Sequence, residues 1–237
     1  MEKLSDLFWN CHTISYDTIG DDVNYKFIED DSTLYIYFQG SNSVTDWIRN
    51  FLFFKKPYKD MEIPYYVHCG FLKAWKEVED LVIEKIQEQD ARLSLNRKKM
   101  KYEEKKSYKF KKIIIVGYSH GGALAAFCHE CCWYWRNDIR DNIFGFGFEA
   151  PRIYRGYRVK KELKERWKNF KIIRDNNDLV THCPPKFLAF THVNNDIIKI
   201  KGDTSLVKGW WIPKCIKSHL PDVVLDGLKK YEEEATK

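Results

Sequence analysis

The chain has 237 residues and a mass of 28.4 kDa, and 44% of its residues are apolar and 16% aromatic. A chain of this size and composition can bury an ample core, which excludes a disordered protein and a fold that depends on disulfide or metal staples. The formal net charge of +6 is too small by itself to indicate nucleic-acid binding.

Signals for secretion and for membrane insertion are not expected from the sequence. Acidic residues come early, no apolar run of signal-peptide length follows, and no stretch approaches the 18 apolar residues of a spanning helix. The seven cysteines are an odd number, which favours free thiols over a disulfide framework in a chain without a secretory signal. These features predict a cytoplasmic protein.

The apolar pattern predicts strands that alternate with helices through the middle of the chain. Strands are predicted, in chain order, at 33–38, 112–116, 142–148, 170–174 and 196–201, the last as one arm of a hairpin. Helices are predicted at 71–89, 121–136, 159–169 and 221–234. This alternation predicts an α/β protein with a largely parallel sheet covered on both faces. Because no linker interrupts it, residues 1–237 are interpreted as a single domain.

One segment carries most of the positive charge. Residues 92–112 hold ten Lys or Arg and two Glu, so the rest of the chain is slightly acidic. Such a run can bind nucleic acid or anionic lipid, but it is more often a solvated insertion. We therefore expect a surface loop or helical extension and no nucleic-acid partner. Because the run enters the 112–116 strand at its start, we expect it to project away from the end of that strand.

The sequence Gly117-Tyr-Ser-His-Gly121 is a G-x-S-x-G motif between a buried strand and a helix of small residues. This context is typical of a nucleophile elbow, in which the serine occupies a strained strand–turn–helix and flanking glycines allow close packing. Ser119 is then the predicted nucleophile, and the backbone N–H of His120 would face a developing oxyanion. The alternative is an ordinary glycine-rich turn.

A serine nucleophile needs a histidine base and an acid that orients it, and behind such an elbow they follow in the order Ser, Asp or Glu, His. The strand at 170–174 runs into a loop with two candidate acids, Asp175 and Asp178. Three histidines follow them, and His219 is favoured over His182 and His192 because it lies in a loop just before the last helix.

The run Cys128-His-Glu-Cys-Cys132 resembles a partial metal site. A closed zinc site needs four ligands, and the sequence offers no matching second pair. Buried thiols on the helix behind the elbow are therefore the preferred interpretation, and no metal or organic cofactor is expected.

Six blocks of the sequence, in order, resemble the class 3 lipases, the fungal-type triacylglycerol lipase family of α/β-hydrolases. They match, over about residues 34–228, the family patterns F-R-G-[ST]-x-S-x-x-[DN]-W, V-H-x-G-F, G-H-S-L-G-G-A-L-A, F-G-x-P-R, N-D-x-V-P-x-L-P-P and the catalytic histidine. The matching segments are Phe38–Trp47, Val67–Phe71, Gly117–Ala125, Phe146–Arg152, Asn177–Pro185 and Ser218–His219.

This resemblance implies an α/β-hydrolase fold and a catalytic triad of Ser119, Asp178 and His219. It also implies that the backbone N–H and hydroxyl of Ser41 join the His120 N–H in an oxyanion hole, with Asp46 placed to hold that serine. Some positions depart from the family pattern without removing a catalytic group. They are Gln39 for arginine, Tyr118 and His120 for histidine and leucine, and Thr181 for proline.

An apolar segment follows the expected oxyanion residues. Trp47, Ile48, Phe51, Leu52 and Phe54 recur at helical spacing. The position resembles that of a lid that opens at a lipid surface, so Trp47, Phe51 and Phe54 are expected to contact substrate. The alternative is a core helix that never moves.

The resemblance implies a serine carboxylester hydrolase that acts on lipid-like esters through an acyl-enzyme, with transient contact to a lipid surface. Alternatives on the same site are a phospholipase A-type or acyltransferase activity. A non-catalytic lipid-binding or scaffold protein on this fold is the alternative from another class.

Overall fold

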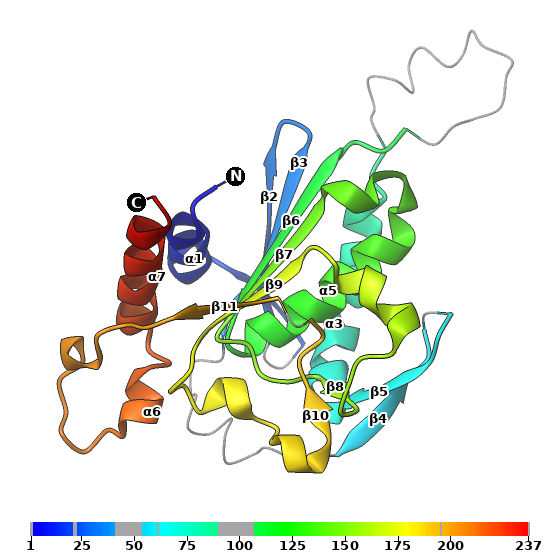
Figure 1. Ribbon diagram of the computed structural model, residues 1–237. Coiled ribbons are helices and arrows are strands. Elements are labelled where there is room, and N and C mark those ends of the chain that lie inside the picture. The colour runs from blue at the N-terminus through cyan, green and yellow to red at the C-terminus, as the bar shows by residue number, and fades with distance from the viewer. Residues whose placement is uncertain are drawn as a thin grey trace, which may run out of the picture.

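The computed structural model describes residues 2–20, 23–40, 54–60, 62–89, 107–194 and 196–236. Its centre is a seven-stranded sheet in the order β1-β2-β3-β6-β7-β9-β11, with the last five strands parallel (Figure 1). The strands are β1 (Asp17–Ile19), β2 (Val23–Asp30), β3 (Thr33–Phe38), β6 (Lys112–Tyr118), β7 (Ile143–Phe148), β9 (Phe170–Asp175) and β11 (Ile197–Ile200). The largely parallel sheet predicted from the sequence is therefore confirmed, with an antiparallel pair of strands added at one edge.

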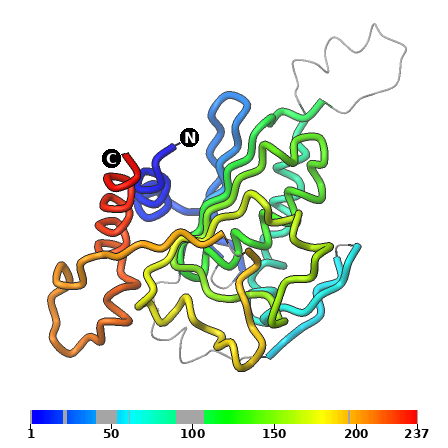
Figure 2. The backbone as a smooth tube through the Cα atoms, in the orientation of Figure 1, coloured from blue at the N-terminus to red at the C-terminus, as the bar shows by residue number. Residues whose placement is uncertain are grey.

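Helices cover both faces of this sheet, as the alternation of elements predicts. One face packs against α3 (Cys69–Ile86) and α5 (His120–Trp135), and the other against α1 (Leu4–Thr13) and α7 (Pro221–Ala235) (Figure 1). The N-terminal and C-terminal helices lie beside each other, as the path of the backbone also shows (Figure 2). Strand β6 is buried from Ile113 onward because it lies between two helical layers.

A second, antiparallel sheet has four short strands in the order β10-β8-β5-β4. These are β4 (Lys55–Tyr58), β5 (Tyr65–His68), β8 (Tyr154–Arg155) and β10 (Phe190–Thr191). Short helical pieces complete the described chain, namely α6 (Lys214–Lys217) and the 3₁₀ turns η2 (Asn137–Asn142), η3 (Lys161–Trp167), η4 (Val180–His182), η5 (Lys186–Leu188) and η6 (Thr204–Leu206). None of the helices among the described residues is both long and apolar enough to cross a membrane.

Two predicted elements differ from the structure. The strand at 196–201 is not one arm of a hairpin, because β11 pairs in parallel with β9 and forms the sheet edge. The helix predicted at 159–169 is the shorter 3₁₀ segment η3, although its buried residues Leu163, Arg166 and Trp167 keep the i, i+3, i+4 spacing on which a helix prediction depends.

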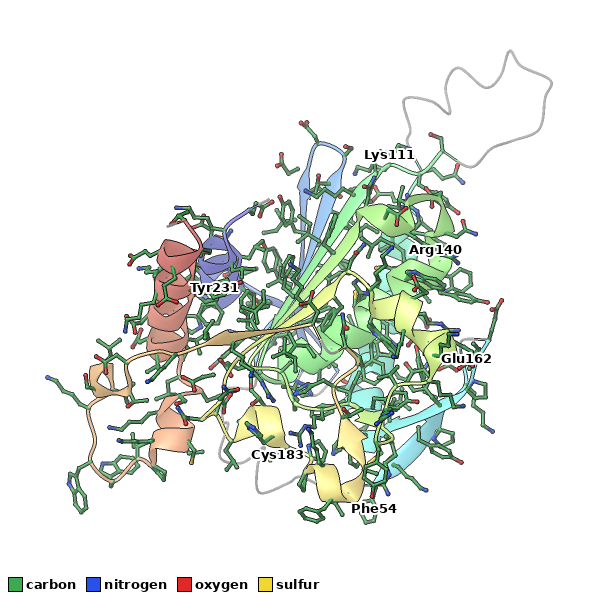
Figure 3. All side chains as sticks on the ribbon, viewed as in Figure 1. Phe54, Lys111, Arg140, Glu162, Cys183 and Tyr231 are labelled. Atoms are coloured by element: carbon green, nitrogen blue, oxygen red, sulfur yellow. The ribbon has the colours of Figure 1, made fainter. Side chains whose placement is uncertain are left out.

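The centre of the Lys-rich insertion, 90–106, lies outside the described residues. On either side of it Gln89 and Tyr108 form an antiparallel bridge. Lys112 begins β6 and Ser119 follows its end, so the insertion joins the strand at the end opposite the motif serine. Figure 3 labels Lys111, which precedes the start of β6, near the upper end of the central sheet. The predicted form of the insertion itself stays a prediction.

Candidate active site

Ser119 lies in the turn between β6 and α5, in the strained conformation that an elbow requires. Its φ is 56° and its ψ is −122°, a left-handed region that costs free energy for any residue with a side chain. The turn is possible because Gly117 and Gly121 have no side chain. A Cβ at Gly117 would come within 2.1 Å of the Gly121 carbonyl oxygen, and one at Gly121 within 2.2 Å of the Phe38 carbonyl oxygen. Strand and helix therefore meet at backbone distance.

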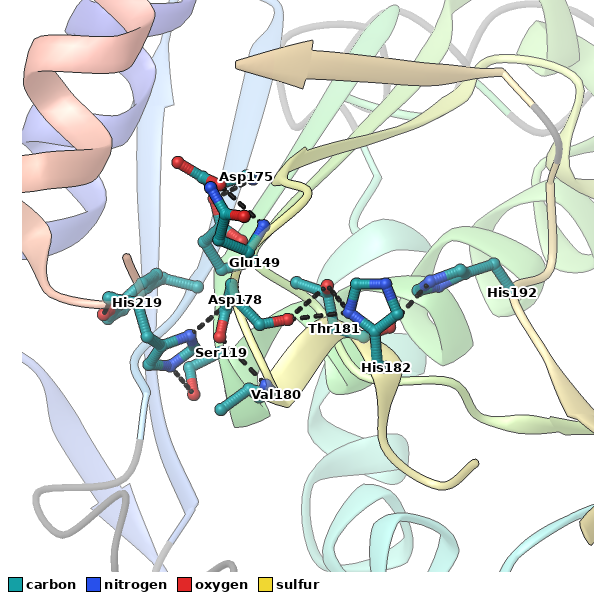
Figure 4. Close-up of polar contacts among 11 residues, drawn as sticks. Ser119, Glu149, Asp175, Asp178, Val180, Thr181, His182, His192 and His219 are labelled. Carbon is teal, nitrogen blue, oxygen red and sulfur yellow. Dashed lines mark hydrogen bonds and ion pairs between the residues drawn. The ribbon is translucent and has the colours of Figure 1, made fainter. Parts of the chain in front are cut away.

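The structure brings together three side chains that lie far apart in the sequence (Figure 4). His219 Nε2 is 2.8 Å from Ser119 Oγ, and His219 Nδ1 is 2.6 Å from Asp178 Oδ2. All three side chains are buried. With the Nδ1–H donated to the carboxylate, Nε2 carries the lone pair that can accept the serine proton.

Tyr118, the residue before Ser119, makes two contacts with His219. The Tyr118 ring stacks on the imidazole with the ring centroids 5.2 Å apart, and its hydroxyl donates to the backbone carbonyl of His219. Tyr118 is one of the departures from the family pattern, and its place in the site is thus to support the base. Burial, together with the nearby negative charge of Asp178, raises the pKa of this phenol well above its usual range, so it stays a donor.

Asp178 is fixed by a turn that leaves one carboxylate oxygen for the histidine. Its Oδ1 accepts from the Val180 N–H at 2.9 Å, and its backbone carbonyl accepts from the Thr181 hydroxyl at 3.0 Å and from His182 Nδ1 at 2.8 Å. His192 donates from Nε2 to the Thr181 carbonyl at 3.1 Å. Burial and neighbouring positive charges lower the pKa of His192 to about 3, so its ring is neutral.

The residues weighed against this set have other contacts. Asp175 accepts from the backbone N–H groups of Asn177 and Gly202, which closes the turn after β9. His182 and His192 bind the backbone of the Asp178 turn rather than Ser119. His68, another histidine outside this set, caps the start of α3 and accepts from the Phe71 N–H.

His120 is the first residue of α5, so its backbone N–H lies at the positive end of a helix dipole beside Ser119. Its ring is 5.5 Å from that of Phe71. Six other predicted positions lie in 41–53, outside the described residues, namely Ser41, Asp46, Trp47, Ile48, Phe51 and Leu52. Phe54 is described and is 66% exposed, with its carbonyl accepting from the Cys69 N–H at 2.9 Å. The oxyanion hole and the lid stay predictions.

Sequence reasoning gave no role to Glu149, which the structure places beside Asp178. The residue follows β7 with a φ of 47° and is fully buried, and its Oε1 accepts from the Asp175 N–H at 2.7 Å. One side-chain oxygen or nitrogen atom of each of Glu149, Asp178 and His219 lies within 4.8 Å of the other two. The available signal was a carboxylate at the end of an otherwise apolar strand.

Glu149 is best described as a neutral carboxylic acid. Burial is the main cause that raises its pKa well above the usual range, and the negative charge of Asp178 raises it further. Among the described residues, Glu149, Asp178 and His219 are also the cluster close enough to hold a metal ion. The Asp178–His219 hydrogen bond already uses two of these ligand groups, which favours a proton-transfer site.

The cysteines of the run 128–132 lie on α5 behind the elbow. The Cys128 and Cys132 thiols are buried and lie 4.0 Å apart.

We expect Glu149→Gln to flatten the dependence of stability on pH. The folded state binds the Glu149 proton above pH 4.5, where the unfolded state loses it, so wild-type stability falls as the pH rises toward the folded pKa. An amide does not ionise, so the free energy of unfolding of Glu149→Gln should fall less between pH 5 and pH 9. Urea unfolding at both pH values measures this, with the exposed Glu162→Gln as control. Parallel losses in wild type and Glu149→Gln would contradict it.

The parallel sheet, the elbow and the helices on both faces define the α/β-hydrolase fold. The model of the class 3 lipase family matches residues 35–188, and the chain therefore belongs to this family. The curated lipase of Rhizomucor miehei is 26% identical over 191 residues, which are 78% of this chain and 46% of the relative. The chain thus spans about half the length of that curated relative.

Solved structures share the fold at low sequence identity. The structure of Rhizomucor miehei triacylglyceride lipase has a TM-score of 0.63 at 20% identity, and the match covers 91% of this chain and 82% of the lipase chain. A mutant form of MDLA from Penicillium cyclopium has a TM-score of 0.58 at 16% identity and covers 94% of both chains. Lipase II from Rhizopus niveus has a TM-score of 0.53 at 24% identity, over 72% of this chain and 59% of its own.

Proposed function

We propose that the protein is a serine carboxylester hydrolase that cleaves lipid-like esters. The observation that carries the proposal is the chain of hydrogen bonds from Ser119 Oγ through His219 to Asp178 at a strained elbow. Membership of the class 3 lipase family supports the ester as substrate, and the lipid-like character follows from the relatives that are named as lipases.

The proposed reaction begins when Ser119 Oγ attacks the ester carbonyl and His219 Nε2 takes its proton. Asp178 holds the imidazole in the correct tautomer and stabilises its charged form. The tetrahedral oxyanion accepts hydrogen bonds from the backbone N–H groups of His120 and, as the family pattern implies, Ser41. His219 then protonates the departing alcohol, and a water molecule activated by the same histidine releases the acyl group.

A fluorophosphonate probe tests the nucleophile directly. We expect one equivalent to label wild type at Ser119, because only a serine whose proton is removed by a base attacks phosphorus readily. Ser119→Ala should take up none, while the exposed Ser205→Ala should be labelled like wild type. Intact-mass measurement and peptide mapping give the stoichiometry and the site. Labelling that persists in Ser119→Ala would show that another residue is the nucleophile.

Substrate class is tested with a panel of short p-nitrophenyl esters, triacylglycerols and phospholipids. The rate should be followed across the solubility limit of a long-chain ester, since a lid over 47–54 predicts a rise when monomers become aggregates. Activity confined to soluble short esters would indicate an esterase instead of a lipase.

A further inference from the structure

Several large apolar side chains are exposed in the segment between β11 and α7. They do not contribute to the site formed by Ser119, His219 and Asp178. Trp210 is 95% exposed, Trp211 72% and Leu206 53%. In Figures 1 and 2 this segment, drawn in orange, extends away from the sheet beside α7. Large apolar side chains that gather on a surface usually mark a site of interaction.

The tip of this segment is built to hold the tryptophans outward. Gly209 has a φ of 118°, a conformation that favours glycine, and the Ile212 N–H donates to its carbonyl at 3.3 Å. Lys217 Nζ donates to the Val207 carbonyl at 2.8 Å and closes the base of the loop. The tryptophan pair therefore lies on a defined turn and not on a free end.

The charge around the tip has a single sign. Residues 204–217 contain three lysines, Lys208, Lys214 and Lys217, and no Asp or Glu. Lys208 and Lys214 are exposed. Tryptophan prefers the boundary between water and hydrocarbon because one part of the indole is apolar and its N–H is polar. Lysines beside it add attraction to negatively charged head groups.

The loop is also joined to the catalytic residues. The Leu179 N–H donates to the Cys215 carbonyl at 3.2 Å, which ties the loop to the turn that holds Asp178. The same loop leads through α6 directly to His219, whose N–H donates to the Ile216 carbonyl at 3.1 Å. The loop that carries the tryptophans is therefore hydrogen-bonded at its base to Leu179 and His219, next to and at two of the candidate catalytic residues.

We propose that this tryptophan loop, residues 204–217, is the element that docks the protein on an anionic lipid surface. The proposal rests on the proposed function and adds where and by what chemistry the protein meets its substrate phase. The indoles of Trp210 and Trp211 insert at the head-group level, and Lys208 and Lys214 contact the phosphates. The residues of this loop are different from those of the predicted lid, 47–54.

The test measures vesicle binding in the inactive Ser119→Ala background, so that lipid is not consumed and binding does not depend on turnover. Vesicles of phosphatidylcholine alone and of phosphatidylcholine with 30% phosphatidylserine are compared by co-sedimentation. We expect Trp210→Ser/Trp211→Ser to lose at least tenfold in affinity for both. Lys208→Gln/Lys214→Gln should lose about 25-fold, at about fivefold per lysine, on the anionic vesicles only.

Two controls separate the docking surface from folding and from catalysis. Trp135→Ser, at the end of α5 away from Ser119, should bind like the parent because that exposed tryptophan is not part of the loop. In the active protein, both loop variants should hydrolyse a soluble short-chain ester at the wild-type rate. If that ester activity is absent in wild type, the proposed function fails while the binding result still stands.

Three results would overturn the docking proposal. Equal vesicle affinity of parent and Trp210→Ser/Trp211→Ser would show that the tryptophans do not bind lipid. If Lys208→Gln/Lys214→Gln leaves the ratio of affinities for anionic and neutral vesicles unchanged, the lysines do not attract the anionic head groups. A concentration-dependent dimer that is abolished by Trp210→Ser/Trp211→Ser, without vesicle binding, would assign the surface to a second copy of the chain.

Discussion

Ser119→Ala and His219→Ala are each expected to lower kcat for a soluble ester by roughly four to six orders of magnitude. The first removes the attacking oxygen and the second removes the base 2.8 Å from it. The double variant should be little worse than either single one, because the two groups act as a unit and neither has a function without the other. Steady-state kinetics on a p-nitrophenyl ester, with kcat and KM separated, measures the effect.

Asparagine substitutions at Asp178 and Asp175 should distinguish the proposed catalytic acid from its neighbour. Asp178→Asn keeps the shape of the side chain but favours the wrong tautomer of His219, and we expect a loss of about 10⁴ in kcat. Asp175→Asn alters a turn that the structure closes with backbone donors, so it should reduce stability more than kcat. Each variant should be shown to unfold cooperatively before its kinetics are compared.

His182→Ala is the matched control for the base, because His182 lies in the same region and was an alternative on sequence grounds. Its imidazole contacts the Asp178 backbone and not Ser119, so a loss of less than about tenfold is expected. Near-normal kcat in His219→Ala together with a collapse in His182→Ala would reverse the assignment of the base.

The predictable part of the fold was the part with a local signal. The β6 strand is a run of β-branched residues that ends at a glycine, and α3 has a clear helical stripe, so both appear in the structure close to their predicted bounds. The chain order and the motifs then indicated a nucleophile and an acid on loops at the ends of strands, and a base in the loop before the last helix.

The parts that were not predicted depend on long-range pairing. β8 is two residues long, and its partner β5 lies in a distant part of the chain, so no local pattern encodes their pairing. β4 pairs with the nearby β5, but it is four residues long, which is too short for a clear strand pattern. The segment 196–201 was correctly recognised as a strand, but its parallel partner β9 lies more than 20 residues earlier. The sequence pattern near 196–201 suggested a hairpin with a neighbouring strand, whereas the strand pairs with the more distant β9.

Buried polar contacts form the second class that the sequence did not reveal. Glu130 was considered as part of a cysteine-rich metal pattern, whereas the structure pairs it with Arg166 from η3. Neither residue carries a motif, and their contact exists only after α5 and η3 have packed together. The same holds for Glu149, whose role depends on its distance from Asp178.

Arg166→Met is expected to lower the free energy of unfolding by about 3–5 kcal/mol near pH 8. Arg166 Nη1 lies 2.5 Å from Glu130 Oε1, both side chains are buried, and the Tyr65 hydroxyl donates to the other carboxylate oxygen. Without the guanidinium, the Glu130 carboxyl group either stays ionised with no cation beside it or takes up a proton, and both cost free energy near pH 8. Urea unfolding of wild type and Arg166→Met measures the loss, with the exposed Arg158→Met as control.

The pH dependence of this loss shows whether the charge is its cause. Burial raises the pKa of Glu130 to about 7 from 4.5, so its proton favours the folded state, and this contribution is complete below pH 4.5 and lost as the pH rises through 7. Removing Arg166 raises that pKa further, since the arginine, together with the Tyr65 hydroxyl, lowers it. The destabilisation by Arg166→Met should therefore be smaller at pH 5, where Glu130 can be protonated, than at pH 8.

The double variant Arg166→Met/Glu130→Gln tests directly whether charge causes the loss of stability. It replaces the pair with neutral groups, so it should recover a large part of the stability at pH 8 and show little difference between pH 5 and pH 8. Because Glu130 lies on α5 well beyond the elbow, folded molecules of either variant should keep wild-type kcat on a soluble ester. If Arg166→Met is equally destabilising at both pH values and Glu130→Gln gives no recovery, the arginine stabilises the fold by packing on α5 and not by its charge.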